Sequence, residues 1–125
     1  MKYLLDTHTL LWYVFDDSNL SETAKNLINN EFCFYSKVSL WEIAIKQSKK
    51  LLSYKQSISD IIKACKDEEF EELFVSDKAL ELIKTLPDIH KDPFDRLLIT
   101  MAITDDLTII TRDTQIPLYN VKTVW

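Results

Sequence analysis

Four acidic residues of this sequence, Asp6, Glu42, Asp95 and Asp113, lie where a predicted strand runs into a predicted helix. Strand-to-helix junctions in an α/β fold share one edge of the sheet, where ligands bind, so we expect the four carboxylates to lie close together. They would repel one another unless a cation joined them. Carboxylate oxygens suit a hard divalent ion such as Mg²⁺ or Mn²⁺. The pattern therefore indicates metal-dependent phosphoryl chemistry.

Each of these acids also has a structural explanation as a helix cap. Ser39-x-x-Glu42 has the spacing of a capping box. Asp92 precedes Pro93 as an N-cap would, and Asp95 follows at the third helical position. One small polar residue is enough to cap a helix, so Ser39 and Asp92 would leave Glu42 and Asp95 as additional acids. Helix N-termini keep carboxylates ionised, so capping and metal binding are compatible.

Short apolar segments alternate with helical patterns along the whole chain. Strands are predicted at 2–5, 32–35, 73–75, 107–110 and 121–125. Helices are predicted at 7–15, from Ser21 onward, and at 39–47, 57–65, 76–86 and 92–104, with a short turn or helical piece at 113–117. This alternation predicts an α/β fold with a mostly parallel central sheet of about five short strands and helices on both faces.

Length and composition narrow the class of protein. A chain of 125 residues is expected to form one domain, 1–125. No apolar run approaches the roughly 18 residues of a membrane span, and Asp6 comes too early for a signal peptide, so a cytoplasmic protein without membrane contact is expected. Cys33 and Cys65 are far apart and lack a CxxC context, so we expect buried, reduced thiols.

Glycine is absent from the sequence. Its absence excludes the phosphate loops GxxxxGK[ST] and GxGxxG, and with them nucleotide binding of the P-loop or Rossmann kind. The turn at Tyr119 and Asn120 is expected to use Asn120 where a glycine would be usual, because Asn tolerates a left-handed backbone.

The charge balance and the basic residues bear on nucleic-acid binding. A net charge of −5 is the wrong sign for bulk electrostatic attraction to nucleic acid. The only two arginines, Arg96 and Arg112, each flank one of the four acids, where they would contact phosphate or form a salt bridge that orients an acid. Lys46 would either reach phosphate or pair with Glu42 one helical turn away.

The histidines and tryptophans permit several roles. His8 and His90 lie near the acids, but a lone histidine is more often packed or exposed than catalytic. Trp12, Trp41 and Trp125 are expected in the core or a dimer interface, with base stacking as the alternative.

Four segments resemble, in order, the motifs of PIN domains. They are Leu4-Leu5-Asp6-Thr7-His8-Thr9-Leu10-Leu11-Trp12, Ser39-Leu40-Trp41-Glu42-Ile43, His90-Lys91-Asp92-Pro93-Phe94-Asp95-Arg96-Leu97-Leu98 and Ile110-Thr111-Arg112-Asp113. Together they cover nearly the whole chain, and the sequence is most similar to the VapC-like toxins of bacterial type II toxin–antitoxin pairs.

This resemblance implies a Mg²⁺- or Mn²⁺-dependent endoribonuclease that hydrolyses RNA phosphodiester bonds with a metal-activated water. It implies that Asp6 and Asp95 bind the metal directly, and that Glu42 and Asp113 hold metal-bound waters or a second ion. The partners implied are an RNA substrate, a second copy in a homodimer, and a cognate antitoxin whose segment enters the active-site groove.

The resemblance also assigns supporting residues. Thr7 would orient the first acid, and Thr111 would lie near the fourth. Asp92 is either an N-cap or a further acid that supports the metal. The sequence departs from the family pattern at Asp105-Asp106, where a glycine is common, which would alter only a turn.

Two alternatives remain open. The chain would instead be a non-catalytic PIN-like module that binds RNA or a partner, with the acids serving as caps. Otherwise it would be another metal-dependent phosphohydrolase, such as a deoxyribonuclease.

Overall fold

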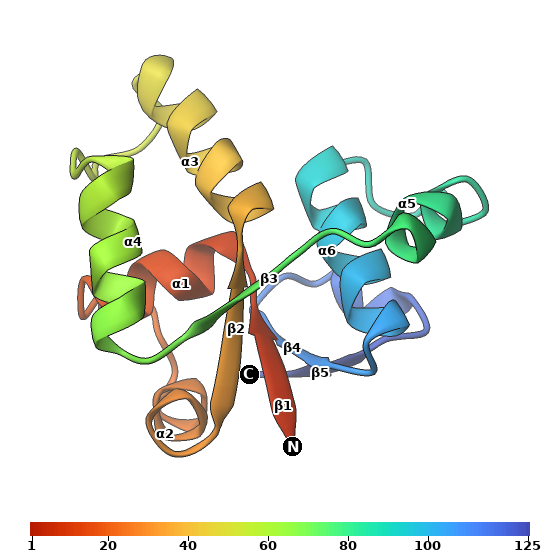
Figure 1. The fold of residues 1–125 in the computed structure, drawn as a ribbon, viewed down its shortest axis with the longest axis horizontal. Helices are drawn as coiled ribbons and strands as arrows, with labels where there is room; N and C mark the ends of the chain where they lie inside the picture. The colour runs from red at the N-terminus through yellow and green to blue at the C-terminus, as the bar shows by residue number, and fades with distance from the viewer.

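A five-stranded parallel sheet forms the centre of the molecule, with the strands in the order β3-β2-β1-β4-β5 (Figure 1). The computed structural model describes all 125 residues. The strands are β1 (Lys2–Leu5), β2 (Phe32–Ser36), β3 (Glu71–Leu73), β4 (Thr108–Ile110) and β5 (Lys122–Val124). The first strand lies at the centre, where Leu4 pairs with Phe34 of β2 on one side and with Ile109 of β4 on the other.

Six α-helices and one 3-10 turn connect the strands. The helices are α1 (Thr7–Val14), α2 (Glu22–Asn30), α3 (Lys37–Ser48), α4 (Ile58–Asp67), α5 (Asp77–Ile83) and α6 (Pro93–Thr104), and the 3-10 turn is η1 (Ile116–Leu118). Three helices begin at a serine, Ser21, Ser57 and Ser76, whose hydroxyl accepts an amide N–H from the third helical residue. None of the helices combines the length and apolar character that a membrane crossing requires.

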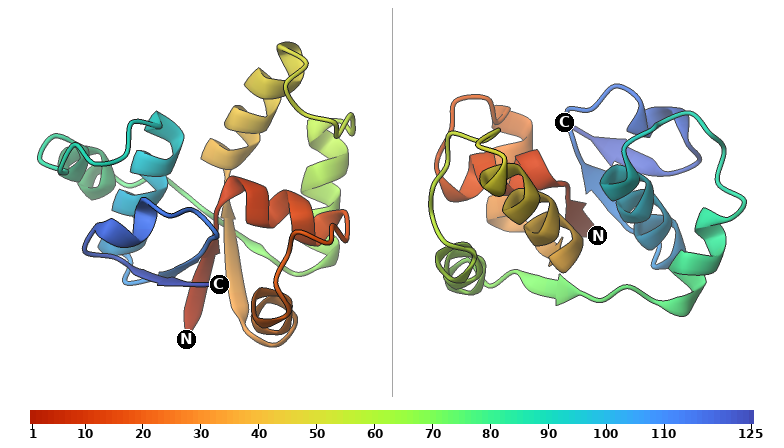
Figure 2. Two further views of the ribbon diagram at one scale, coloured as in Figure 1. Left: turned by 180° about the vertical axis from the view of Figure 1, so that it is seen from behind. Right: turned by 90° about the horizontal axis from the view of Figure 1, so that it is seen from above.

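The sheet separates two hydrophobic cores. Tyr3 and Leu5 of β1 point into the core that holds the buried side chains of α1, α2 and α4, and Leu4 points into the core built on α5 and α6. This alternation follows from the two-residue period of a strand. Helices therefore cover both faces of the sheet, as the views in Figure 2 show, and the predicted α/β architecture is confirmed.

Three local predictions were wrong. Helix α3 begins at Lys37 directly after β2, and its N-cap is Ser36, whose Oγ accepts the amide N–H of Val38 at 3.0 Å. Ser39 lies inside the helix, so the capping box with Glu42 does not form. The third strand, β3, ends at Leu73, two residues before the predicted end.

The residues that adopt a left-handed backbone conformation also differ from the expected one, Asn120. The residues with positive φ are Asp16, Lys50, Glu69 and Asp106, and Asn120 is not among them. Asp106 has φ 54° in the turn between α6 and β4. This is the turn in which the sequence replaces an expected glycine, so an aspartate takes the left-handed conformation there.

The strand order reverses between β1 and β4. Chain segments leave these two neighbouring strands in different directions, β1 into α1 and β4 toward η1, so a crevice opens at their carboxyl ends. Asp6 follows β1 directly, and Thr111 follows β4. The strand order therefore places the first and last predicted motifs beside each other.

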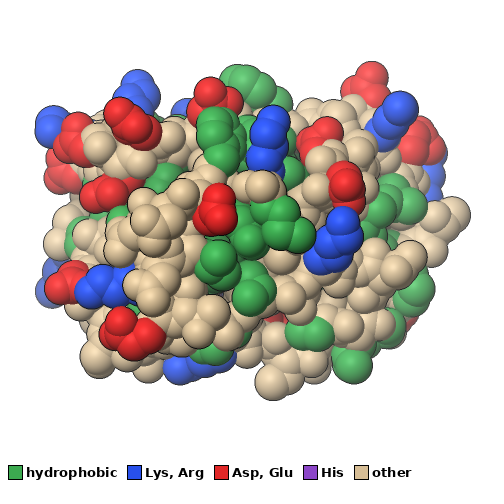
Figure 3. Space-filling view, turned by 90° about the horizontal axis from the view of Figure 1, so that it is seen from below, with side chains coloured by type: hydrophobic (Ala, Val, Ile, Leu, Met, Phe, Trp, Pro, Cys, Tyr) green, Lys and Arg blue, Asp and Glu red, His purple; other side chains and the backbone are tan.

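The opposite end of the sheet has a different surface. Figure 3 shows this end, which lies at the amino ends of the strands, from below. Acidic and basic side chains are scattered there around a central group of hydrophobic side chains. Met1 and Phe32, both exposed, lie at this end next to β1 and β2. On this face acidic side chains lie among basic ones.

Candidate functional site

All four predicted acids line one cavity of about 370 Å³ at the carboxyl ends of the strands. Only one of the eleven lining residues is hydrophobic. They are Asp6, Thr7, His8, Trp12, Glu42, Lys46, His90, Asp92, Asp95, Arg112 and Asp113. The predicted gathering of carboxylates is therefore found in the folded chain.

Asp6 is the N-cap of α1 and is almost fully buried. Its Oδ1 accepts the amide N–H of Thr9 at 2.9 Å, and its Oδ2 accepts the hydroxyl of Thr111. Burial raises the pKa of Asp6, and these hydrogen bonds oppose that shift. Thr111 Oγ1 also accepts the amide N–H of Asp113 at 3.0 Å. Thr111 therefore links Asp6 to the backbone of Asp113. The prediction for Thr111 was only a position near Asp113.

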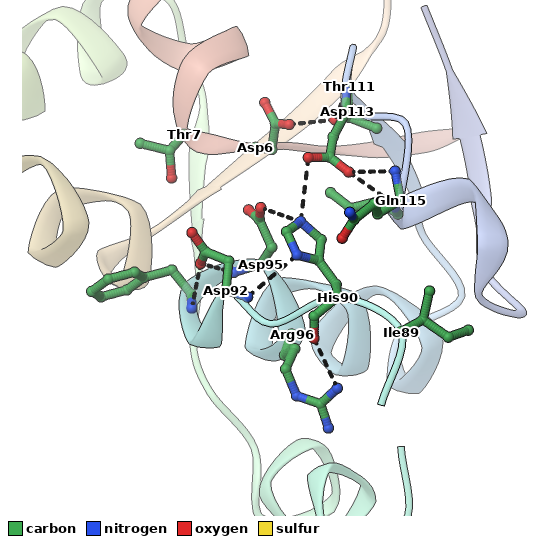
Figure 4. Close-up of polar contacts among 12 residues, drawn as sticks. Asp6, Thr7, Ile89, His90, Asp92, Asp95, Arg96, Thr111, Asp113 and Gln115 are labelled. Carbon is green, nitrogen blue, oxygen red and sulfur yellow. Dashed lines mark hydrogen bonds and ion pairs between the residues drawn. The ribbon is translucent and has the colours of Figure 1, made fainter. Parts of the chain in front are cut away.

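Asp95 and Asp113 meet at the ring of His90 (Figure 4). The Nε2 atom of His90 lies 2.9 Å from Oδ2 of Asp95 and 3.2 Å from Oδ2 of Asp113. Oδ1 of Asp113 accepts the amide N–H groups of Gln115 and Ile116 at 2.7 and 2.9 Å. Asp113 is therefore held at both oxygens, by the loop before η1 and by the imidazole.

The tautomer of His90 follows from its other nitrogen. The amide N–H of Asp92 donates to Nδ1 of His90 at 3.3 Å. An amide can only donate, so Nδ1 accepts, and we assign the imidazole proton to Nε2, which faces the two carboxylates. His90, Asp95 and Asp113 have possible ligand atoms within 4.8 Å of one another. In this tautomer, however, His90 is a hydrogen-bond donor to the acids and not a ligand of a metal.

Asp95 lies among several other acids of the site. Burial, followed by the charges of Asp92, Asp6, Glu42 and Asp113, raises its pKa to about 8. Its Oδ2 contacts His90, whereas its Oδ1 accepts no hydrogen bond. A carboxylate in this setting would become fully ionised at neutral pH if a cation bound beside it.

Asp92 caps α6 as predicted. Its Oδ1 accepts the amide N–H groups of Phe94 at 2.8 Å and Asp95 at 3.0 Å, and Pro93 occupies the first turn. Asp92 also lines the cavity. Capping is thus observed, and the same residue fixes the backbone that carries Asp95.

Glu42 is held in a separate environment on α3. Its Oε1 accepts the hydroxyl of Thr7 at 2.6 Å, and its Oε2 pairs with Nζ of Lys46 at 2.7 Å. Thr7 Oγ1 also lies 3.0 Å from Oγ of Ser39. Thr7 therefore orients Glu42, and not Asp6 as predicted. Of the two roles considered for Lys46, the ion pair with Glu42 is the one observed.

Arg96 lies outside the cavity lining. Its guanidinium donates to the carbonyl oxygens of Leu86, Pro87 and His90 and to the hydroxyl of Tyr119, at 2.9–3.2 Å. It pairs with no carboxylate, so the acid-orienting salt bridge predicted for it does not form. Arg96 instead fixes the loop that carries His90 into the site.

Arg112 does line the cavity, and it pairs with no acid. Its guanidinium lies over the ring of Trp12, with Cζ 4.5 Å from the ring centroid, and Nη1 donates to Asn19 at 3.3 Å. Trp12 also packs against Trp125 and His8. The arginine is therefore held in a defined place with its charge available to an anion.

The remaining tryptophan lies on the surface. Trp41 is 59% exposed and packs edge-on against Phe94. It does not fill the core, so a dimer interface and base stacking are the predicted roles that remain for it. Cys33 and Cys65 are buried free thiols, as predicted, and burial raises the pKa of each to about 12.

Oxygen donors dominate the site and fit a hard divalent ion. Asp6, Asp95 and Asp113 turn carboxylates toward a common region (Figure 4), and no lysine or arginine pairs with any of the three. A buried group of like charges is costly unless a cation joins it. Such a site can hold Mg²⁺ or Mn²⁺ next to a phosphate group.

The sequence model of the PIN domain family matches residues 3–122. The chain belongs to the PIN domain family. PIN domains are nucleases that use divalent metal ions, which agrees with a hydrolase of phosphodiester bonds and with the acidic cluster described above. The comparison with curated proteins finds no match.

Solved structures share the fold of this PIN domain. A chain in the crystal structure of VapBC2 from Rickettsia felis, bound to a DNA fragment from its promoter, superposes with a TM-score of 0.72 at 16% identity, over 100% of this chain and 99% of that one. A toxin–antitoxin complex from Klebsiella pneumoniae gives 0.65 at 17%, and FitAcB from Neisseria gonorrhoeae gives 0.65 at 13%, each over 98% of this chain and 96% of the other. At these identities the likeness shows the fold.

His90 was expected to be packed or exposed, whereas its ring lies between two acids of the site in this PIN domain. Its position two residues before the Asp92 cap was a usable signal, because the turn into α6 returns the side chain toward Asp95. The contact with Asp113, which lies 23 residues further along the chain, depends on the neighbouring loop after β4 and has no local signature.

Proposed function

We propose that this PIN domain is a metal-dependent endoribonuclease, the toxin of a type II toxin–antitoxin pair, that hydrolyses RNA phosphodiester bonds. The observation that carries the proposal is the grouping of Asp6, Asp95 and Asp113 in one cavity with Glu42 at its wall. Capping accounts for Asp6, and Asp92 already caps the helix of Asp95. The ionised form of Asp95 has the His90 N–H as a hydrogen-bond donor but no positive charge beside it unless a cation binds.

Within this proposal Asp6 and Asp95 bind Mg²⁺ or Mn²⁺, with Glu42 and Asp113 in support. When bound, the ion would lower the pKa of a water and neutralise charge that develops on the phosphate. The chain contributes the alignment. Thr111 positions Asp6, His90 holds Asp95 and Asp113 together, and the amide groups of the loop before η1 fix Asp113.

Arg112 is the proposed contact for an RNA phosphate. It lines the cavity, forms no ion pair with an acid, and is held over Trp12. A planar guanidinium suits two phosphate oxygens, and stacking on an aromatic ring lowers the entropy lost when it binds them. Arg96 is occupied by carbonyl groups and takes no part in this contact.

A cognate antitoxin and a second copy of the chain are the proposed protein partners. The structural neighbours include toxin–antitoxin complexes, which supports the first. The exposed side chains of Phe74, Val75 and Leu80, at the start of α5, supply apolar surface that a second copy would cover. Sedimentation of the purified chain would test the dimer. We further propose that the protein acts in the cytoplasm.

The substrate class is tested by incubating the protein with Mn²⁺ and three substrates in parallel: a structured RNA, a single-stranded DNA of the same sequence, and p-nitrophenyl phosphate. The proposal expects cleavage of the RNA alone, with 5′-phosphate and 3′-hydroxyl ends, and loss of cleavage in Asp95→Asn. Cleavage of the DNA in preference to RNA would assign a deoxyribonuclease. Absence of all three activities, with RNA binding intact, would assign a binding module.

A further inference from the structure

The acids of the cavity are divided into two groups by the charges beside them. Glu42 is 3% exposed, and a full positive charge lies 2.7 Å from its Oε2, on Lys46 of the same helix. Its other oxygen accepts the Thr7 hydroxyl at 2.6 Å. Both oxygens of Glu42 are therefore occupied, and its charge is balanced by the chain itself.

The second group has no such counter-charge. Asp6 accepts one amide and one hydroxyl, and Asp95 and Asp113 share one imidazole N–H. Lys46 and Arg112 are the lysine and arginine residues of the lining, and Arg112 pairs with no acid. The acids of the lining without a basic partner are therefore Asp6, Asp92, Asp95 and Asp113, and of these Asp92 is the N-cap of α6.

The closest group of ligand-type atoms in this cavity also excludes Glu42. It consists of His90, Asp95 and Asp113, and Asp6 lies outside it as well. A cation placed on Glu42 would have to displace the Lys46 ammonium or lie beside it, and two positive charges at a few ångströms repel each other strongly in a partly buried site.

We propose that Lys46 takes the place of a second metal ion, so that the cavity binds a single divalent ion on Asp6, Asp95 and Asp113. This inference rests on the proposed metal-dependent function and adds the number of ions to it. Lys46 acts as a positioning residue: its ammonium holds Glu42 at the wall of the cavity without a metal of its own.

The number of bound ions is the direct test. Mn²⁺ is titrated into the purified, metal-free protein, and free Mn²⁺ is counted by electron paramagnetic resonance while heat is measured by calorimetry. One ion per chain is expected, with the same count in Glu42→Gln and no binding in Asp95→Asn. Two ions in the wild type, or a loss of one ion in Glu42→Gln, would overturn the inference while leaving the proposed function intact.

Variants of Lys46 make the test specific. Lys46→Met removes the counter-charge of the buried Glu42. We expect this variant to bind a second Mn²⁺ or to need Mn²⁺ for full thermal stability. Lys46→Arg keeps the counter-charge and should bind one ion. Lys49→Met, an exposed lysine at the end of the same helix, is the matched control and keeps the wild-type count. A Lys46→Met count of one with unchanged stability would contradict the inference. A wild type that binds no Mn²⁺ would instead refute the metal-dependent function itself.

Discussion

His90 Nε2 lies 2.9 Å from Oδ2 of Asp95 and 3.2 Å from Oδ2 of Asp113, so one imidazole N–H serves two carboxylates that lie 18 positions apart in the chain (113 minus 95). The backbone on both sides of the ring is also fixed. Tyr119 Oη accepts the amide N–H of His90 at 2.7 Å, and Arg96 donates to the carbonyl of His90. The imidazole therefore acts as a preformed bridge between two of the proposed metal-binding acids.

Loss of this bridge should destabilise the metal-free protein. In EDTA at pH 9, where Asp95 is ionised, we expect His90→Ala to lower the free energy of unfolding by about 1.5–3 kcal/mol, the usual contribution of a hydrogen bond to a charged group. His90→Gln, whose amide can donate to the same oxygens, should recover part of that loss. Urea unfolding measures both. His8→Ala, at an exposed position, is the control, and equal stability of His90→Ala and His8→Ala would contradict the bridge.

The raised pKa of Asp95 makes stability depend on pH. A carboxyl whose pKa rises on folding, here to about 8 from 3.8, binds more protons in the folded state than in the unfolded state between those values. Stability must then fall as pH rises through this range. We expect metal-free wild type to lose stability relative to Asp95→Asn between about pH 4 and pH 8, and the difference to level off above pH 8, as measured by urea unfolding.

Two further measurements complete this prediction. Asp105→Asn, an exposed change of the same chemistry at the end of α6, should follow the wild-type pH profile. Saturating Mn²⁺ should flatten the wild-type profile, because the ion binds the ionised carboxylate of the folded state. Parallel profiles for wild type and Asp95→Asn in EDTA would show that Asp95 titrates normally.

Arg96 should matter for folding and not for RNA contact. Its guanidinium donates to three carbonyl groups and the Tyr119 hydroxyl, so we expect Arg96→Met to cost about 1–3 kcal/mol of stability, because it breaks a partly buried hydrogen-bond network. Arg96→Lys keeps the charge but cannot reach the same acceptors, and should also be destabilised. If Arg96→Met unfolded at the wild-type midpoint but bound RNA weakly, a direct phosphate contact would be indicated instead.

Arg112, in contrast to Arg96, should matter for RNA contact and not for folding. Replacing it with Met should weaken RNA binding and reduce the slope of log K against log salt by about 0.7, the value for one phosphate contact on a single strand. The measurement is RNA binding to the Asp95→Asn background, which prevents cleavage, at several salt concentrations. Lys55→Met, at an exposed position in the loop before α4, is the control. An unchanged slope in Arg112→Met would remove Arg112 from the RNA contact.

The fold was predictable because its signals are local. Runs such as Lys2–Leu5 and the serines before α2, α4 and α5 mark strands and helix starts through periodicity and capping. The start of α3 was misplaced because β2 runs into it without a loop, so Ser36 ends the strand and caps the helix together. Ser39 had an equally good capping pattern, but its hydroxyl contacts Thr7, whereas the hydroxyl of Ser36 accepts the amide N–H of Val38.

The site was predictable as a set of acids, but their individual environments were not. Asp6, Asp95 and Asp113 gather because each follows the carboxyl end of a strand or begins a helix at that edge, and Glu42 joins them from the second turn of α3. Which hydroxyl orients which acid depends on contacts across the fold, such as Thr7 to Glu42, 35 positions apart, and Thr111 to Asp6, 105 apart. No local pattern encodes those pairings.

The most direct test of the central claim is Mn²⁺-dependent RNA cleavage by wild type and Asp6→Asn. The amide oxygen of the substituted side chain can still accept the N–H of Thr9, so the variant removes the charge and keeps the start of α1. Loss of an outer contact to a metal site costs about 10–100-fold, so removing a direct ligand should slow cleavage by roughly a hundredfold or more. We expect wild type and Asp105→Asn to cleave, and cleavage to disappear in Asp6→Asn and in EDTA. Equal cleavage by wild type and Asp6→Asn, or cleavage that persists in EDTA, would contradict the account.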